Sequence, residues 1–319
     1  MYLFPKTNFD FLRLRWAFFL ISGTLLGASV LSLATRGVHY GIDFTGGTVV
    51  ELKFDKNVEL KDLRQAFKKA GVADAAMQRY TGTNIFSIRI QANAQRSSER
   101  IDQELASVQA DFPGNAMTLD SKSYVGPAVG RHLFQQAVWA IVLSLAGIII
   151  YLGFRFSNPI WGVAGIIALF HDVLATYGLF SIMGMEVDLL IVSAMLTIGG
   201  YSIHDTIVIF DRMREKLKHM RKEPLDQVMN ESMNETLSRT LITSSTVLIV
   251  VTILYFFGGP VIHHFALAMV FGTLVGTYSS IAVATPLVYE WTQRGARRQR
   301  QAQSAAPARP TSKPKPLKK

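Results

Sequence analysis

Six long uncharged stretches constrain the fold of this 319-residue chain more than any other feature of its sequence. An α-helix rises 1.5 Å per residue, so about 20 apolar residues are needed to cross the hydrocarbon core of a bilayer. We expect membrane-spanning helices at 16–35, 133–154, 160–183, 189–210, 240–262 and 265–289. No small-residue cleavage site follows the first stretch, so we expect it to be retained rather than removed as a signal. The chain is therefore predicted to be an α-helical polytopic membrane protein.

The distribution of Lys and Arg predicts the orientation of these helices, because short cytoplasmic loops carry an excess of both residues. Lys and Arg are frequent in the N-terminal segment 1–15, in the loop 211–239 within the helical region 133–290, and in the tail 291–319. The short loops 184–188 and 258–264 contain neither. We therefore expect both chain ends in the cytoplasm and the long connection 36–132 on the outer side.

The connection 36–132 is predicted to fold as an extracytoplasmic α+β domain. Alternating β-forming residues predict strands, and apolar residues at helical spacing predict helices. The expected strands are 48–54, 75–80, 85–91 and 117–124, and the expected helices are 59–70 and 97–112. The order β-α-β-β-α-β is that of a ferredoxin-like split unit. Its acids and bases are scattered as on a solvated surface, so we expect no catalytic site there.

Composition excludes several classes of function. The chain has no cysteine, which excludes a disulfide framework, a thiolate metal site and a cysteine nucleophile. It has no G-x-x-x-x-G-K-[ST] sequence, so it is not its own ATPase. The segment 299–319 is rich in Ala, Pro, Gln, Ser and Lys without periodicity, which predicts disorder. Its charge is not interleaved with aromatic residues, so we expect contact with anionic lipid headgroups rather than with nucleic acid.

Ionisable residues inside the predicted spans are the candidates for function, because placing such a charge there costs about 2.5 to 3.5 kcal/mol. Asp172 lies near the middle of the third span, Asp205 near the inner end of the fourth, and Arg239 at the inner end of the fifth. Asp205 and Arg239 are expected at similar depth, where they can pair. A carboxylate that is paired in one conformation and buried alone in another can carry protons. The alternatives are a static salt bridge, or an Arg239 side chain that extends to the headgroups.

Histidine precedes both aspartates, as His171 and His204. Neighbouring residues on a helix point about 100° apart, so we expect neither His–Asp pair to share a face and expect no metal site. We expect protons to be the coupling ion, and we expect no cofactor. Small and hydroxylated residues around Asp205 and Arg239 are predicted to pack the helices closely, to bond across them or to hold water. These supporting residues are Gly200, Tyr201, Ser202, His204, Thr206, Thr240, Thr243 and Ser244.

Several motifs occur in the same order as in one known family. They are Gly-Ile-Asp-Phe-Thr-Gly-Gly-Thr at 41–48, Val-Gly-Pro at 125–127, the Gly-Tyr-Ser segment 200–212, Arg-Thr-Leu-Ile-Thr-Ser at 239–244 and Phe-Gly-Gly-Pro at 257–260. In these motifs the chain resembles the SecF members of the SecD/SecF family of protein-export membrane proteins, within the resistance-nodulation-division superfamily. The family's membrane aspartate falls on Asp205 and its arginine on Arg239. Its outer structural motif falls on Gly41, Asp43, Gly46 and Gly47.

The sequence departs from the family pattern at two positions beside the aspartate motif. His204 stands where the family usually has Asn, and Gly199 stands where a larger apolar residue is usual.

The resemblance implies a non-enzymatic subunit of the Sec export machinery in the bacterial inner membrane. The implied partners are a six-helix SecD, the SecYEG channel and its motor ATPase SecA, with YajC and YidC beside them. The proton-motive force would help to draw preproteins across the membrane. The alternatives are a small-molecule or lipid exporter of the resistance-nodulation-division type, and a purely structural assembly subunit.

Overall fold

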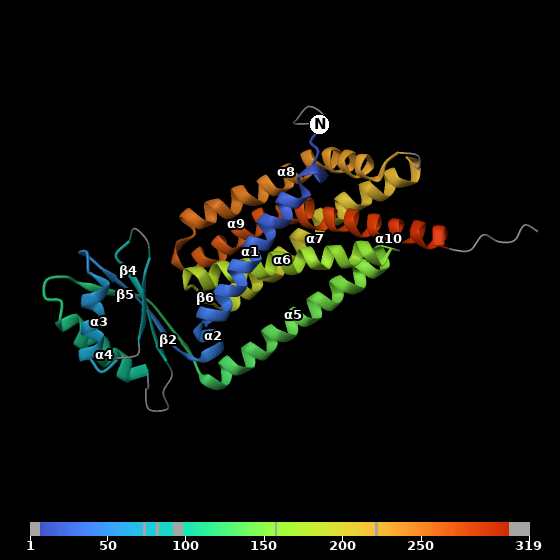
Figure 1. The fold of residues 1–319 in the computed structure, drawn as a ribbon. Helices are drawn as coiled ribbons and strands as arrows, with labels where there is room; N and C mark the ends of the chain where they lie inside the picture. Colours follow the sequence, from blue (N-terminus) through green and yellow to red (C-terminus); the bar gives the residue numbers. More distant parts are fainter. Residues whose placement is uncertain are drawn as a thin grey trace, which may run out of the picture.

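The computed structural model describes residues 7–72, 75–80, 83–91, 98–156, 158–220 and 223–305. Long helices form a bundle, and an α+β domain lies at one end of it (Figure 1). Six helical segments in this part of the chain are long and apolar enough to cross a membrane. The predicted class of polytopic α-helical membrane protein is thereby confirmed.

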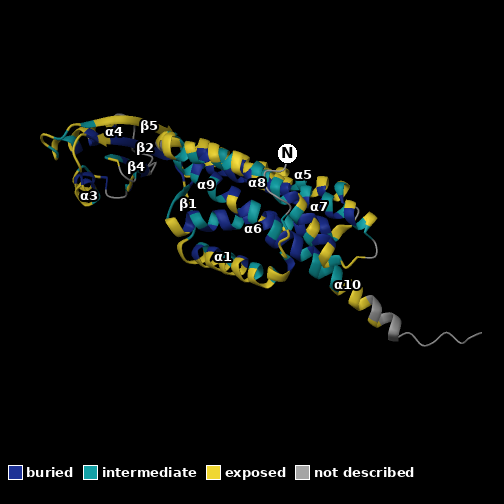
Figure 2. Cartoon of the chain, turned by 90° about the horizontal axis from the view of Figure 1, so that it is seen from above, coloured by how far each residue is buried: buried dark blue, intermediate teal, exposed yellow. Residues whose placement is uncertain are grey.

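The bundle has a central and a peripheral set of helices. The central set is α6 (Pro159–Met183), α7 (Leu189–His219) and a continuous helical segment made of α9 (Gly259–Ser279), the π-helical η2 (Ser280–Ala284) and α10 (Thr285–Ala305). The peripheral set is α1 (Arg15–Arg36), preceded by the 3₁₀ turn η1 (Leu12–Leu14), then α5 (Pro127–Arg155) and α8 (Leu225–Phe257). Figure 2 shows exposed residues along α1 and α5, whereas α6 is largely buried.

The apolar stretches of the two sets are buried to different extents within the chain. The buried share is 11% to 17% in the peripheral helices and 56% to 61% in the central ones. Exposed apolar surface of this extent requires lipid or another protein as its neighbour.

The predicted connection 211–239 is largely helical, because α7 continues to His219 and α8 begins at Leu225. Helix α7 has 31 residues and α8 has 33, lengths of about 46 to 50 Å against a hydrocarbon core of about 30 Å. Ion pairs join the two extensions: Arg212 bonds Glu235 at 2.6 Å, and Lys216 lies 2.8 Å from both Glu231 and Glu235. Charges that suggested a loop therefore face each other across two helices.

The predicted ends of several spans also differ from the structure. Helix α5 begins at Pro127, so residues 127–132 belong to the helix and not to the outer domain. The expected outer loop 258–264 is a tight turn, because α8 ends at Phe257 and α9 begins at Gly259, whose φ is +77°. Pro260 fits the first turn of α9, where no backbone N–H is needed.

The basic tail is helical further than predicted. The predicted tail 291–319 and its disordered part 299–319 overlap α10, which continues to Ala305. Glu290 and Arg294, four residues apart, form an ion pair at 3.8 Å on this helix. Residues 306–319 lie outside the described residues.

The outer domain contains the six predicted elements within two residues at either end. They are β2 (Gly47–Phe54), α3 (Leu60–Lys69), β3 (Ala76–Arg79), β4 (Ile85–Gln91), α4 (Ser98–Ala110) and β5 (Met117–Val125). The sheet order is β3-β4-β2-β5 with every neighbour antiparallel. Val50 lies opposite Ile88 and Lys122, for example. Helices α3 and α4 cover one face, where Leu63, Phe67, Leu105 and Val108 join the apolar residues of the sheet in one core.

A short connector that the sequence did not predict joins the outer domain to the bundle. Strand β1 (His39–Tyr40) pairs in parallel with β6 (Glu186–Val187), which lies in the turn between α6 and α7. The short helix α2 (Ile42–Thr45) follows β1. Arg89 of β4 forms an ion pair with Glu186 and donates to the Tyr40 carbonyl at 3.1 Å. The domain therefore contacts the bundle through β4 as well as through the chain connections.

Candidate functional site

Asp172 of α6 is the ionisable residue most completely enclosed within the described bundle, with 0% of its surface exposed. Its Oδ2 accepts a hydrogen bond from Ser279 Oγ of α9 at 2.8 Å and another from Ser202 Oγ of α7. Its Oδ1 lies 2.9 Å from Nδ1 of His171. Charge-assisted bonds of this kind compensate the desolvation of a buried carboxylate. The carboxylate thus links three central helices.

The expectation that His171 and Asp172 do not share a face is wrong. The 100° between neighbouring residues describes where their Cβ atoms point, and side chains several atoms long can still converge beyond Cβ. The His171 ring is 3% exposed, and its Nε2 has no hydrogen-bond partner among the described residues. The described residues include no group of three or more His, Cys, Asp or Glu that could hold a metal ion.

Two glycines of α9 allow this close approach of the helices. A Cβ on Gly276 would lie 3.0 Å from Cβ of Ser202, and one on Gly272 would lie 2.3 Å from Cδ1 of Ile198. The G-x-x-x-G spacing is typical of close membrane-helix contacts. It was visible in the sixth predicted span and could have shown which helix faces α7.

A π-helical segment, η2, lies beside the Asp172 site. Pro286 follows it and has no N–H to donate to a carbonyl one turn earlier, so a regular α-helix cannot continue through this point. The wider π turn accommodates the proline, and the Thr285 hydroxyl donates to the Ser280 carbonyl at 3.0 Å. The helical segment therefore continues through Pro286 into α10. Ser280 Oγ lies 3.0 Å from Thr206 Oγ1, so this segment also contacts α7.

Asp205 lies one helical turn beyond Ser202 on α7 and is 2% exposed. Its Oδ2 has no hydrogen-bond partner in the described part of the chain. Arg239 of α8 is exposed, and no ion pair or hydrogen bond between the two side chains exists among the described residues. The structure therefore does not join this pair.

A cavity of about 1120 Å³ is lined by Arg239 of α8 and by residues of α7 that follow Asp205 in the chain. It lies between α7, α8 and the N-terminal segment, and its lining includes Val208, Asp211, Arg239 and Leu241. The cavity therefore reaches Val208, which is about one helical turn from Asp205 along α7.

The other predicted supporting residues differ in their surroundings. Tyr201 donates to Ser244 Oγ at 2.9 Å, and Ser244 lies 2.7 Å from Thr277 Oγ1, which joins α7, α8 and α9 through hydroxyl groups. Thr243 bonds within its own helix, to the Arg239 carbonyl at 3.1 Å. Thr240 is buried and its hydroxyl has no partner among the described residues. Gly200 and His204 are exposed, so neither is part of the buried site.

The predicted outer motif has a structural role at the start of α7. Asp43 Oδ2 accepts from the Leu189 N–H at 3.0 Å, and Asp188 Oδ1 accepts from the Ile191 N–H at 2.8 Å. Two carboxylates therefore cap one helix, and one of them comes from a segment 146 positions away. Burial raises the pKa of Asp188. The negative charge of Asp43 also raises this pKa, whereas the backbone N–H donors lower it.

The glycines of this motif bring the connector close to α5 and β6. Gly46 has φ +74°, and a Cβ there would lie 2.9 Å from Cα of Pro127, where α5 begins. A Cβ on Gly41 would lie 3.0 Å from Cβ of Asp188, and Gly47 begins β2. The motif thus joins β1, α2, β2, α5 and α7 at one point.

In the described part of the chain, six helices that are long and apolar enough to cross a membrane, with a carboxylate enclosed among three of them and an α+β domain at one end, define a polytopic membrane protein with an ionisable group in its helical core. Residues 105–294 match the family described as protein export membrane protein SecD/SecF, C-terminal, and residues 31–58 match the SecD/SecF GG motif. The chain belongs to the SecF branch of this family of Sec protein-export subunits.

Similar proteins cover most of the chain. The protein translocase subunit SecF of Endomicrobium trichonymphae is 40% identical over 91% of this chain and 94% of its own length. That of Escherichia coli O157:H7 is 38% identical over 88% and 86%, respectively. The crystal structure of SecDF from Thermus thermophilus matches 92% of this chain at 37% identity with a TM-score of 0.82. SecDF in a super-membrane-facing form matches 96% with a TM-score of 0.66.

The two kinds of relative differ in length. The chain spans 40% of the Thermus thermophilus SecDF chain and 41% of the second SecDF chain, but nearly all of the SecF proteins. The relatives are named as translocase subunits, which is a transport role rather than catalysis.

Proposed function

We propose that the chain works with a SecD-like half as a proton-driven accessory of Sec protein export in the bacterial inner membrane. The matching SecDF chains are longer than this chain, which leaves room for such a second half. The exposed apolar faces of α1, α5 and α8 offer surface for it as well as for lipid. The preprotein is the cargo. The resemblance extends the proposed partners to SecYEG and SecA, with YajC and YidC.

The proposed orientation places both chain ends in the cytoplasm and the α+β domain outside. The positive-inside distribution of Lys and Arg supports it. The outer domain and the end of α10 lie at opposite ends of the bundle (Figure 1). We assign the domain to the ferredoxin-like fold, and the antiparallel order β3-β4-β2-β5 supports that assignment.

The observation that carries the proton role is the enclosure of Asp172. Ser202 and Ser279 donate to one carboxylate oxygen from two different helices. Protonation would remove the negative charge that both donors stabilise, and so would weaken the contact of α6 with α7 and α9. One charge that crosses the membrane is worth about 2.3 kcal/mol per 100 mV, enough to shift an equilibrium of a few kcal/mol.

Asp205 is the second proton group of the proposal, on the inner side of Asp172. Its Oδ2 has no partner among the described residues, Val208 of the inner cavity is one turn away on α7, and Ser202, one turn away on the other side, donates to Asp172. A movement of Arg239 from the cavity wall toward Asp205 would give that carboxylate a counter-charge. Alternation between the paired and unpaired states would couple protonation to helix packing.

The test is preprotein translocation into vesicles that contain the assembled complex, with and without a proton gradient. Asp172→Asn and Asp205→Asn should each reduce the gradient-dependent stimulation by about ten-fold or more while the complex still assembles. Asp62→Asn removes an exposed carboxylate of α3 and should leave stimulation unchanged. Full stimulation in both membrane variants would reject the proton role. If the variants fail to assemble, but the complexes that do form keep full gradient-dependent stimulation, the purely structural alternative would be favoured.

A further inference from the structure

Two adjoining cavities open at the inner end of the bundle, and one of them shares Asp211 and Glu215 with the lining of the Arg239 cavity but does not include Arg239. They share Arg214 and Lys218 of α7, and we call them together the Arg214 cavity. The first part has a volume of about 360 Å³ and its walls include Phe156, Trp161, Leu217, Leu225, Met229 and Val288. The second has about 390 Å³ and is also lined by Arg155, Asp211, Glu215 and His219.

The charges around the Arg214 cavity leave two cations uncompensated. Arg155 forms an ion pair with Asp211, and Glu215 is paired with Arg212 at 2.6 Å. Arg214 donates to the backbone carbonyl of Arg155 at 3.3 Å, but neither Arg214 nor Lys218 has a carboxylate partner within the described residues. The two residues are four apart on α7, so they lie on one face of the helix. The cavity therefore has a net attraction for an anion.

The position of these cations along α7 places them at the level of lipid headgroups. Arg214 follows Leu189, the first residue of the helix, by 25 positions. At 1.5 Å per residue that is about 37 Å, just beyond a hydrocarbon core of about 30 Å. Trp161 lies at the start of α6 on the same side, where tryptophan favours the membrane–water boundary.

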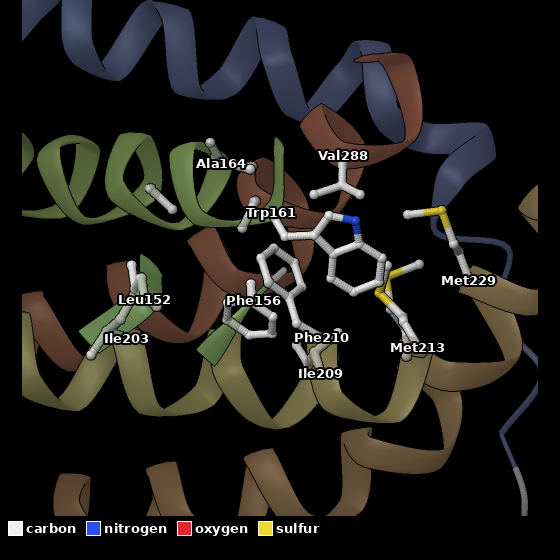
Figure 3. Close-up of a cluster of buried hydrophobic side chains, with 14 of the residues drawn as sticks. Leu152, Phe156, Trp161, Ala164, Ile203, Ile209, Phe210, Met213, Met229 and Val288 are labelled. Carbon is white, nitrogen blue, oxygen red and sulfur yellow. The ribbon is translucent and has the colours of Figure 1, made fainter. Parts of the chain in front are cut away.

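The walls of the cavity suit an apolar chain as well as an anion. Figure 3 shows four residues of the cavity lining, Phe156, Trp161, Met229 and Val288, in one cluster with the fully buried Phe210 and Met213. The Trp161 and Phe210 rings lie 5.2 Å apart in an edge-to-face arrangement. Methionine and aromatic side chains present a polarisable apolar surface. A small soluble anion would gain nothing from such walls.

We propose that the Arg214 cavity binds an anionic phospholipid of the adjacent leaflet. Its phosphate lies between the guanidinium of Arg214 and the ammonium of Lys218, and the upper part of an acyl chain lies against Trp161 and Met229. Basic pockets between membrane helices recognise anionic headgroups in this way. The inference is independent of the proton role, because it uses none of the residues assigned to that role.

The test uses the full chain, purified in detergent and freed of lipid. Each probe is then added, and native mass spectrometry counts the molecules that stay bound. The probes are phosphatidylglycerol, phosphatidylcholine and inorganic phosphate. The wild-type chain should retain phosphatidylglycerol in preference to phosphatidylcholine. The double substitution Arg214→Gln with Lys218→Gln should weaken that retention by about 25-fold, since each cation near an anionic headgroup contributes a factor of about five.

A matched control removes the same charge from the same end of the bundle. Arg297 and Arg298 of α10 are exposed and do not line the cavity, so Arg297→Gln with Arg298→Gln should retain phosphatidylglycerol as the wild type does. Lys218→Gln alone changes one exposed side chain, so the variant is expected to fold normally. It should weaken the retention of phosphatidylglycerol by about five-fold.

Three outcomes would overturn the proposal. Equal loss in the cavity and control variants would mean that diffuse surface charge attracts the lipid. Displacement of phosphatidylglycerol by an equal concentration of inorganic phosphate would identify a free-anion site instead. Unchanged retention of phosphatidylglycerol in the cavity variants would mean that the lipid binds elsewhere on the chain.

Discussion

At the residue scale, Asp172 and Asp205 are two buried carboxylates in unlike surroundings. Hydroxyl donors from α7 and α9 and the ring of His171 contact Asp172, whereas Oδ2 of Asp205 has no partner in the part of the chain that the structure describes. A buried polar group without a partner costs more free energy than a paired one. The conformation seen here is therefore one in which Asp172 is satisfied and Asp205 is not, which makes Asp205 the group that gains most from a new partner.

Asp188 allows a prediction about pH at the junction with the outer domain. Because burial raises the pKa of Asp188, its ionised form lowers the free energy of unfolding at neutral pH. This cost disappears as the pH falls through the raised folded-state pKa to the ordinary unfolded value. Asp188→Asn keeps a cap acceptor without the charge, so it should raise Tm by about 2 °C at pH 8 and by nothing at pH 3.5.

The measurement is a thermal melt of the purified chain at both pH values. Asp43→Asn serves as the comparison, because the other capping carboxylate of α7 is only half-buried and accepts one backbone bond. A lower Tm for Asp188→Asn at pH 8 would mean that the carboxylate charge stabilises the cap.

At the element scale, the sequence predicts which segments are helices far better than where they end. An uncharged run of about 20 residues predicts a helix by itself, since a helix satisfies all backbone groups in lipid within one segment. The ends depend on contacts made after folding. From the sequence, the charges at 211–239 indicate a loop. In the structure, Arg212 and Lys216 of α7 pair with Glu235 of the neighbouring helix α8.

The candidate site was predictable only where it lies within one element. Asp172, Ser202 and Asp205 are visible as polar residues inside apolar runs, whereas the role of Ser279 depends on α9 packing beside α6 and α7. His171 was misjudged from Cβ directions. The cap that Asp43 places on α7 and the uncompensated charges of Arg214 and Lys218 are tertiary features, which helical periodicity does not encode.

The contact between α7 and α9 predicts the effect of a larger residue at Gly276. Gly276→Val would place methyl groups where Cβ alone already lies 3.0 Å from Ser202. Helix α9 would move away from α7, and Ser279 would lose its bond to Asp172. Overpacking of this kind costs about 1 to 3 kcal/mol, so Tm of the purified chain should fall by several degrees.

Gly147→Val is the matched control for that substitution. Gly147 is exposed on α5, and nothing lies within 4 Å of a Cβ built there. This variant carries the same change in helix propensity without the clash, so its Tm should stay within about 1 °C of the wild type. Equal losses in both variants would mean that propensity, rather than the α7–α9 contact, sets the effect.

At the scale of the whole molecule, the outer domain and the bundle meet through a small number of specific contacts. They include the β1–β6 pair, the ion pair of Arg89 with Glu186, and a hydrogen bond of 3.4 Å from Gln78 to the Gly184 carbonyl, besides the contacts of Asp43 and Gly46 described above. Glu186 and Gly184 lie in the turn between α6 and α7, the helices that carry Asp172 and Asp205. A change in the packing of these two helices therefore reaches the outer domain through one short turn.

The absence of cysteine from the chain permits a direct test of whether this junction must open during export. His39 and Glu186 are Cα partners in the parallel β1–β6 pair, a spacing that an engineered disulfide can bridge. If the outer domain moves with the helices, oxidation of the His39→Cys, Glu186→Cys variant should abolish gradient-dependent translocation by the assembled complex, and a reductant should restore it. Each single variant under the same oxidant should keep its activity, which separates the cross-link from the loss of the Glu186 ion pair. Undiminished translocation with the disulfide formed would mean that β1 and β6 stay paired throughout, and any movement of the outer domain would then have to begin beyond the connector, between α2 and the sheet.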